Sequence, residues 1–152
     1  MSWNYTTEAL AKILGVEAPG DGVSFSNVST DTRSLQPGDL FFALRGENFD
    51  GDDYVSKAFA KGAIAAVTSR ACDAGPCLVL ENPLIALQTF SAHHRTQYDL
   101  PVLAITGSCG KTSAKDFTHA VLNANQARED DGTIVKTPGN FNNDIGCPIS
   151  LL

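Results

Sequence analysis

Short apolar runs separated by polar loops dominate the first 82 residues. Four of these runs predict strands, and they cover residues 23–28, 40–44, 63–67 and 77–80. The run at 40–44 is apolar throughout, which is typical of a strand buried on both faces. Amphipathic stretches at 9–14 and 54–61 each end at a glycine and predict helices. This order predicts a small α/β domain over residues 1–82.

A strong helix start follows at Asn82 and Pro83, because asparagine caps helices well and proline is favoured in the first turn. Leu84, Leu87 and Ser91 then repeat on one side. We therefore expect residues 83–99 to form a linking helix and a second domain to begin at residue 100.

The pattern changes after residue 100. An apolar run at 101–106 predicts a strand, and a glycine-rich loop and a helical pattern at 111–123 follow it directly. Residues 133–137 predict a second strand, and Pro148 is a candidate helix start. Two strands and one complete helix cannot bury a full core. The pattern thus predicts only the first, truncated part of a P-loop-type parallel-sheet domain.

Composition narrows the class of protein. The 152 residues are 43% hydrophobic and 18% charged, which is a normal globular balance. A net charge of −6 provides no general attraction for nucleic acid or for an anionic membrane. The chain shows neither a signal peptide nor a membrane span, so we expect a cytoplasmic protein, and a monomer. The cysteine spacing fits no zinc or redox motif and predicts four free thiols: Cys72, Cys77, Cys109 and Cys147.

The loop after the 101–106 run carries the candidate chemistry. Glycines let a backbone approach phosphates closely, and the amides of the following helix start point at one centre. The candidate ATP-binding residues are Gly107, Ser108, Cys109, Gly110, Lys111, Thr112 and Ser113. Lys111 is the candidate catalytic residue, and the Thr112 hydroxyl is the candidate ligand for Mg²⁺. Because residue 105 is isoleucine, the loop is shorter than the usual motif, and a plain glycine turn is the alternative.

Three motifs carry a family resemblance. The sequence Thr-Gly-Ser-Cys-Gly-Lys-Thr at 106–112 resembles the ATP loop of the Mur ligase superfamily, which also includes folylpolyglutamate synthases. Residues 29–33, 37–44 and 46–51 resemble its amino-terminal uridine-binding domain. Residues 139–148 resemble the branch that joins D-alanyl-D-alanine to UDP-N-acetylmuramoyl-tripeptide. The resemblance implies an ATP- and Mg²⁺-dependent amide ligase of peptidoglycan precursor synthesis that works through an acyl phosphate.

The resemblance also implies a set of residues that hold the UDP substrate. They are Thr32, Arg33, Gly46, Glu47, Asn48, Phe49, Thr137, Asn140, Asn142 and Asn143. Each has a structural alternative: an Asp31–Arg33 ion pair, ordinary core packing for Phe49, and turn formation for the asparagines. The family often has histidine at the position of Asp52, so the chain departs from the family pattern there and Asp52 is not among the predicted substrate-binding residues.

Three functions stay open at this point. The first is a ligase of which this chain is an incomplete portion, inactive alone. The second is a non-enzymatic nucleotide-binding module. The third is a related Mur or folylpolyglutamate-type ligase with another acceptor. His93 and His94 have no carboxylate partner nearby in sequence, so surface exposure or packing is expected for them.

Overall fold

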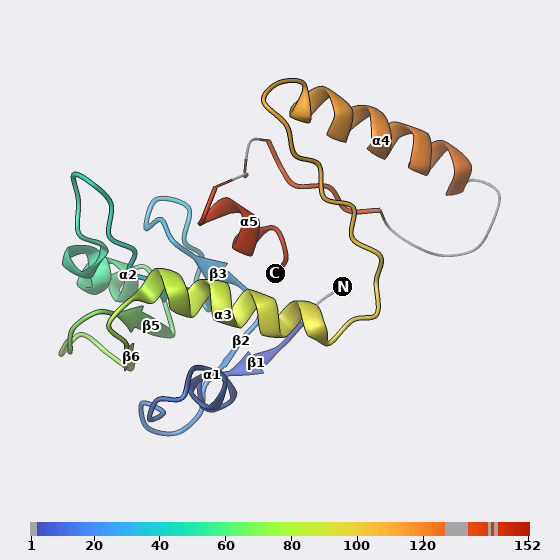
Figure 1. Ribbon diagram of the computed structural model, residues 1–152. Helices are drawn as coiled ribbons and strands as arrows, with labels where there is room; N and C mark the ends of the chain where they lie inside the picture. The colour runs from blue at the N-terminus through green and yellow to red at the C-terminus, as the bar shows by residue number, and fades with distance from the viewer. Residues whose placement is uncertain (1–2, 127–133, 140, 142) are drawn as a thin grey trace.

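A computed structural model describes residues 3–126, 134–139, 141 and 143–152 (Figure 1). Its strands are β1 (Tyr5–Thr6), β2 (Ser24–Phe25), β3 (Val28–Ser29), β4 (Leu40–Phe42), β5 (Ala65–Thr68) and β6 (Cys77–Val79). Its helices are α1 (Thr7–Leu14), α2 (Val55–Ala60), α3 (Pro83–Thr96), α4 (Lys111–Gln126) and α5 (Gly146–Ile149), with a 3₁₀ turn, η1, at Gly51–Tyr54. The α/β class predicted for the first part of the chain is confirmed.

A four-stranded parallel sheet in the order β3-β4-β5-β6 forms the centre of the fold. Leu40 pairs with Val28 on one side and with Ala65 on the other, so β4 is an interior strand, as its apolar run predicted. The predicted strand at 23–28 is wrong as a single element. Its first part, β2, pairs antiparallel with β1, while β3 joins the main sheet.

The break between β2 and β3 has a local cause. The Asn27 side chain donates to Asp39 Oδ1 at 2.7 Å, and the Asn27 carbonyl accepts from the Leu40 amide. These bonds join Asn27 to the residues that start β4 and turn the chain from one sheet into the other. Polar residues inside a short apolar run therefore end one strand and start the next.

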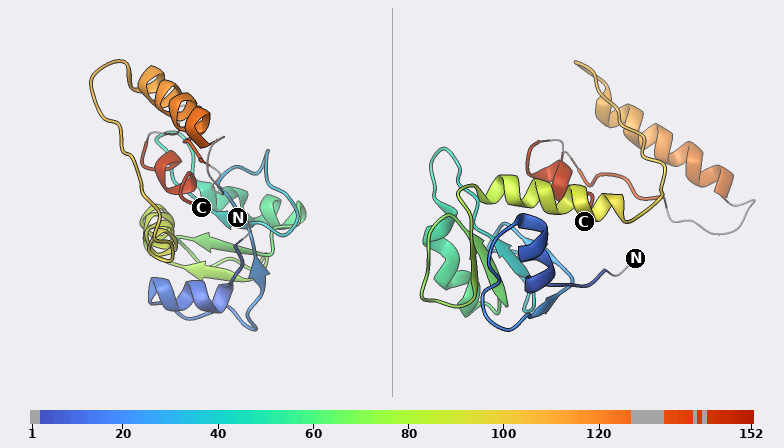
Figure 2. Two further views of the ribbon diagram at one scale, coloured as in Figure 1. Left: turned by 90° about the vertical axis from the view of Figure 1, so that its right-hand side faces the viewer. Right: turned by 60° about the horizontal axis from the view of Figure 1, so that its bottom comes forward.

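Helices cover both faces of the sheet (Figure 2). One face buries Phe42 and Val67 against residues of α1 and α3, such as Leu10, Leu87 and Phe90. The other face packs against α2, and its buried residues are Leu35, Phe41, Ala43, Val55, Ala58, Ala63 and Ala66. This three-layer core positions the loops at both edges of the sheet.

The helix signals of the sequence are confirmed at both ends of this core. The Asn82 side chain accepts from the amides of Leu84 and Ile85 at 3.0 and 3.3 Å, and it caps α3. Thr6 caps α1 by accepting from the Ala9 amide at 3.1 Å. Capping satisfies amide groups that a helix start leaves unpaired, which is why these residue types predict helix starts so well.

The two strands predicted after residue 100 are wrong over the described residues. Neither 101–106 nor 134–137 is a strand, and within the described part of the chain no strand pairs with either segment. A strand needs a neighbour for its hydrogen bonds, so an apolar run alone does not form one. The helix between them is present as α4, which stands away from the sheet (Figures 1 and 2).

The end of the chain folds back onto the first part. Helix α5 begins at Gly146, ahead of the predicted start at Pro148, and packs against α3. Gln88 on α3 donates to the Asp144 carbonyl at 3.2 Å, and the Trp3 indole donates to the Leu152 carbonyl. Residues 143–152 therefore pack against the sheet-bearing part of the chain. The boundaries at residues 82 and 99 stay predictions.

The expectation of four free thiols is wrong for two of them. Cys72 and Cys77 form a disulfide, while Cys109 and Cys147 are free and exposed. The loop from β5 to β6 turns back on itself and brings Cys72 beside the first residue of β6, which sequence spacing did not reveal. No helix over the described residues is both long and apolar enough to cross a membrane.

Candidate functional site

The glycine loop leads directly into the first turn of α4. Gly107 and Gly110 have φ angles of 152° and 78°, in the region that disfavours other residues. The Lys111 ammonium donates to the Gly107 carbonyl, so the side chain lies back over its own loop. Residues 107–110 are exposed. The loop thus combines two glycine conformations and an exposed backbone with a lysine side chain held beside it, and its binding of ATP phosphates stays a prediction.

Helix α4 also positions the segment that contains Thr137. The Lys115 ammonium donates to the carbonyls of Thr137 and Gly139 at 2.9 and 2.7 Å. Lys136 pairs with Asp116 at 2.7 Å, which lowers the pKa of that carboxyl. Lys115 was not among the predicted site residues. Its position one helical turn after Lys111 is the signal that could have identified it.

The loop after β3 contains Thr32 and Arg33. Thr32 is buried, whereas Arg33 is exposed and binds Asp31, with Nη2 and Oδ2 2.6 Å apart. Hydrogen bonds from the Arg33 side chain and backbone lower the pKa of Asp31 to about 2. The structural alternative, an ion pair within the loop, is therefore observed. Substrate binding by Arg33 stays a prediction.

The loop after β4 contains the second group of predicted residues. Its tip, formed by Glu47, Asn48 and Phe49, is exposed, and Phe49 is 54% exposed. Core packing for Phe49 is therefore wrong. Its ring lies against Gly46, where a Cβ atom would come within 2.2 Å of the nearest ring carbon. Since β3 and β4 are parallel, this loop and the Thr32 loop leave the same edge of the sheet, the edge where open α/β sheets bind ligands.

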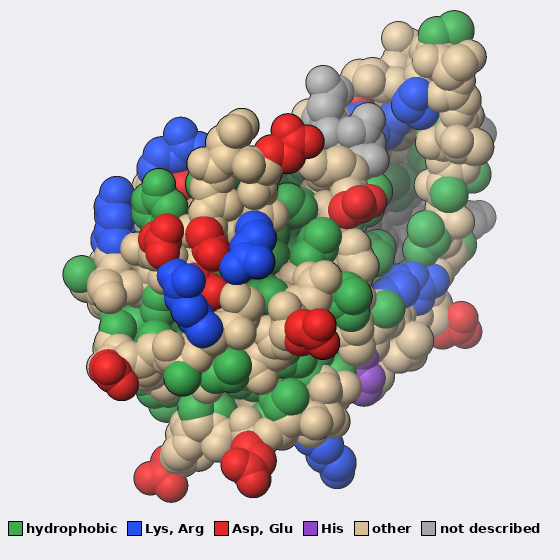
Figure 3. Space-filling model, turned by 60° about the vertical axis from the view of Figure 1, so that its left-hand side comes forward, with side chains coloured by type: hydrophobic (Ala, Val, Ile, Leu, Met, Phe, Trp, Pro, Cys, Tyr) green, Lys and Arg blue, Asp and Glu red, His purple; other side chains and the backbone are tan. Residues whose placement is uncertain are grey.

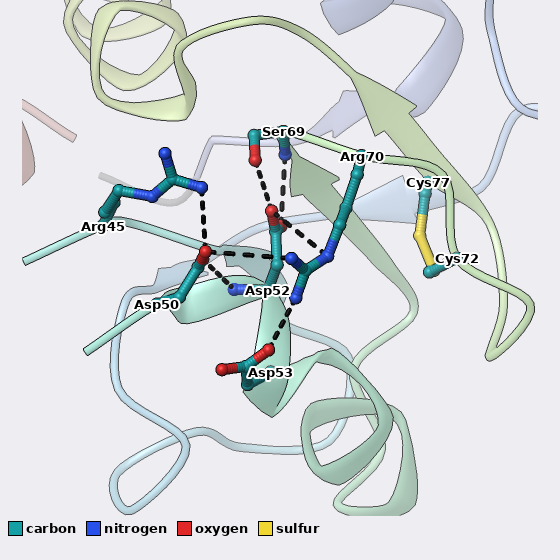
Figure 4. Close-up of polar contacts among 8 residues, drawn as sticks. All are labelled: Arg45, Asp50, Asp52, Asp53, Ser69, Arg70, Cys72 and Cys77. Atoms are coloured by element: carbon teal, nitrogen blue, oxygen red, sulfur yellow. Dashed lines mark hydrogen bonds and ion pairs between the residues drawn. A yellow bond between two sulfur atoms is a disulfide. The ribbon is translucent and has the colours of Figure 1, made fainter.

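Charged residues gather beside this loop in a group that sequence patterns did not predict. Asp52, Asp53 and Arg70 interact there, together with Arg45 and Asp50 (Figure 4). Acidic and basic side chains are interspersed over this side of the molecule (Figure 3). Asp52 and Arg70 lie far apart in sequence, and no local motif joins them.

The remaining predicted residues have structural roles or lie outside the description. Asn143 Oδ1 accepts from the Gly146 amide at 2.7 Å, so its turn-forming alternative is observed. Asn140 and Asn142 lie outside the described residues. His93 is exposed, and His94 is buried with its Nδ1 3.2 Å from the Tyr5 hydroxyl, as expected for a packing residue. Burial and the neighbouring His93 lower the pKa of His94.

Metal binding has one candidate ligand, Thr112, at the start of α4. Over the described residues, no three His, Cys, Asp or Glu side chains are grouped as a metal site. A single hydroxyl fits Mg²⁺ only when nucleotide phosphates and water supply most of the other ligands. The residues present therefore fit a metal that arrives with a nucleotide.

Comparison with known proteins gives three findings. The family model described as "Mur ligase family, catalytic domain" matches residues 24–93, which cover the main sheet and most of α3. The chain is 42% identical to the UDP-N-acetylmuramoyl-tripeptide–D-alanyl-D-alanine ligase of Escherichia coli over 97% of this chain and 31% of that protein. It is 40% identical to the enzyme of the same name from Synechocystis, over 92% of this chain and 30% of that protein.

Solved structures agree with these relatives. A crystal structure of MurF from Acinetobacter baumannii matches with a TM-score of 0.85 at 32% identity, over 99% of this chain and 33% of that one. A MurF ligase from Thermotoga maritima in complex with ADP matches with a TM-score of 0.71 at 27% identity, over 82% of this chain and 28% of that one. The chain thus spans about a third of the length of the relatives that it matches.

Proposed function

The chain belongs to the Mur ligase family, and from this we propose that it supplies the UDP-substrate and ATP-phosphate loops of a cytoplasmic ligase that joins D-alanyl-D-alanine to UDP-N-acetylmuramoyl-tripeptide. The observation that carries the proposal is the similarity to named ligases of this specificity over nearly the whole chain. That similarity favours the joining of D-alanyl-D-alanine to UDP-N-acetylmuramoyl-tripeptide over the reactions of related ligases with other acceptors.

The two groups of loops bind different ligands, one the phosphates of ATP and the other the uridine diphosphate of the substrate. The glycine loop and the start of α4 offer amides and a helix dipole to phosphate oxygens, and Lys111 adds a full positive charge. The loops at the carboxyl edge of the sheet offer backbone groups, the Phe49 ring and the Arg33 guanidinium to a uridine diphosphate. A Thr112 hydroxyl would contribute to holding Mg²⁺ together with the nucleotide.

Catalysis of this class of reaction depends mainly on how the reactants are positioned. In ATP-dependent amide formation, the substrate carboxylate attacks the γ-phosphate to give an acyl phosphate and ADP, and the amine then attacks the acyl carbon to form the amide and release inorganic phosphate. Lys111 would neutralise charge that builds on the transferred phosphoryl group, and the carboxyl-edge loops would hold the acceptor by its nucleotide end. Residues 1–152 alone would bind these ligands without turnover, in line with the expectation of an incomplete apparatus.

Calorimetric titration of the 152-residue chain tests the proposal, with Mg-ATP and UDP-N-acetylmuramoyl-tripeptide as separate ligands. We expect both to bind. Lys111→Ala should abolish ATP binding, because it removes the only full positive charge of the 107–113 loop, and should leave the UDP ligand unaffected. Lys12→Ala on α1 is the matched control, and it should change neither affinity. Equal ATP binding by wild type and Lys111→Ala, or no binding of the UDP ligand, would contradict the proposal.

A further inference from the structure

The loop from β4 to η1 carries the proposed contacts to the nucleotide-sugar, and it is held at a narrow neck. The Gly46 amide donates to the Phe49 carbonyl, and the Gly51 amide donates to the Leu44 carbonyl, both at 2.9 Å. A Cβ atom on Gly51 would lie 2.4 Å from the Leu44 oxygen, so the two sides of the neck are in direct contact. Asp52 is the first residue after this neck, so its side-chain contacts hold the base of the loop.

Asp52 joins this neck to the next strand of the sheet. Its side chain is 2% exposed. Oδ1 accepts from the Ser69 amide at 3.1 Å, and Oδ2 accepts from the Ser69 hydroxyl. Ser69 directly follows β5, so the two bonds connect the loop after β4 to the carboxyl end of β5 (Figure 4). A buried carboxylate is stable only with such partners, which makes this contact specific in geometry.

Arg70 lies beside the Asp52–Ser69 contact and forms ion pairs with the neighbouring carboxylates. Its guanidinium lies 2.5 Å from Asp53, 3.9 Å from Asp50 and 4.0 Å from Asp52. Arg70 and Asp53 are 57% and 66% exposed, and exposed ion pairs contribute little to stability. The buried Asp52–Ser69 contact is therefore the anchor of the loop, and the surface pairs are secondary.

The charges of the group exclude a direct role as a phosphate subsite. Asp50, Asp52 and Asp53 outnumber Arg45 and Arg70, and both arginines are already paired with carboxylates. A nucleoside diphosphate would meet excess negative charge there. What the group can do for such a ligand is hold the loop that binds it.

From these contacts we propose that Asp52 is a positioning residue of the nucleotide-sugar site. Its carboxylate holds the neck of the 45–51 loop against Ser69, so that Gly46, Glu47, Asn48 and Phe49 are presented to the uridine diphosphate in one arrangement. This inference rests on the proposed function. Without the Asp52–Ser69 contact, the loop would become ordered only when the ligand binds. The entropy cost of that ordering would weaken the affinity for the ligand.

The test compares variants of the 152-residue chain in titrations with UDP-N-acetylmuramoyl-tripeptide. Asp52→Ala should raise the Kd about 10-fold or more, the size expected for losing hydrogen bonds to a charged group. Asp52→Asn should restore binding to within about 3-fold of wild type, because its amide keeps the shape and can exchange two hydrogen bonds with Ser69. Asp53→Ala is the matched control and should bind like wild type, since Asp53 pairs only at the surface.

Two further measurements separate positioning from loss of fold. Each variant is checked by thermal unfolding and by its Kd for Mg-ATP, which a loop at the sheet edge should leave unchanged. Ser69→Ala removes only the hydroxyl bond and keeps the amide bond, so it should weaken UDP-ligand binding by a smaller factor, about 3-fold. If Asp52→Ala does not fold, Ser69→Ala and Asp52→Asn carry the test.

Each outcome decides a different point. Wild-type affinity in Asp52→Ala and in Ser69→Ala overturns the positioning role and leaves the proposed function standing. An equal rise of the Kd for the UDP ligand in Asp52→Asn and Asp52→Ala also overturns it, because binding would then depend on the charge of Asp52 and not on its hydrogen-bond geometry. A wild-type chain that binds no UDP ligand overturns the proposed function, and this inference with it.

Discussion

Two apolar runs of similar composition form different structures in this molecule. Residues 40–44 are all buried, and β4 lies between two parallel neighbours. Residues 101–106 form no strand, and Val102 and Leu103 are 62% and 67% exposed. An apolar run predicts a buried strand only where neighbouring strands complete its hydrogen bonds and helices cover its faces.

The helices that follow these runs show the same contrast. Helix α3 buries Leu87 and Phe90 against the sheet. Helix α4 is as regular, but Phe117 is 74% exposed, and Val121 and Leu122 are exposed as well. Local pattern is enough to form α4, whereas the free energy of burial depends on what covers the apolar face.

One pair of substitutions tests whether the two regions differ in how well their apolar residues are buried. Phe42→Ala should lower the free energy of unfolding by about 3–5 kcal/mol, because it opens a cavity in the core. Phe117→Ala makes the same chemical change on α4 and should shift it by no more than about 0.5 kcal/mol. Urea unfolding followed by the fluorescence of Trp3 measures both. Similar losses in the two variants would show that α4 is covered as well as the sheet is.

A smaller effect comes from the buried histidine of the first region. Because the pKa of His94 in the folded chain lies below its ordinary value of 6.5, the unfolded chain binds the proton more readily. Stability should be fully present above pH 6.5 and should be lost as pH falls through the folded pKa. His94→Gln keeps a partner for the Tyr5 hydroxyl and does not titrate, so its unfolding free energy should vary less across this range.

Unfolding in urea at several pH values measures this slope. Replacement of the exposed His93 by alanine serves as a control and should keep most of the pH dependence. The interpretation fails if His94→Gln and wild type lose stability in parallel.

The smallest effect is expected at the exposed Asp31–Arg33 pair. Arg33→Ala should raise the pKa of Asp31 from about 2 toward its ordinary value of 3.8, as followed by a carboxyl NMR titration. The pair contributes stability above about pH 3.8, and the contribution is lost as pH falls toward 2. Because both groups are exposed, the unfolding free energy at pH 7 should change very little. A larger change would mean that the loop carries more of the fold than its exposure suggests.

Local signals account for what the sequence by itself determined. The caps at Thr6 and Asn82 and the glycine loop before α4 each depend on residues within a few positions of one another. Such patterns reflect backbone preferences and hydrogen bonds that form in any context, so reading the chain alone finds them.

Tertiary structure alone decided the rest. It exposed the Phe49 ring, joined Cys72 to Cys77, left 101–106 without a partner strand among the described residues, and brought the Asp52 carboxylate to Ser69. These outcomes depend on which distant segments lie side by side, and residue type at one position carries no information about its neighbour in space. The anchor of the proposed nucleotide-sugar loop belongs to this second class, because its two residues meet only when β4 and β5 pair.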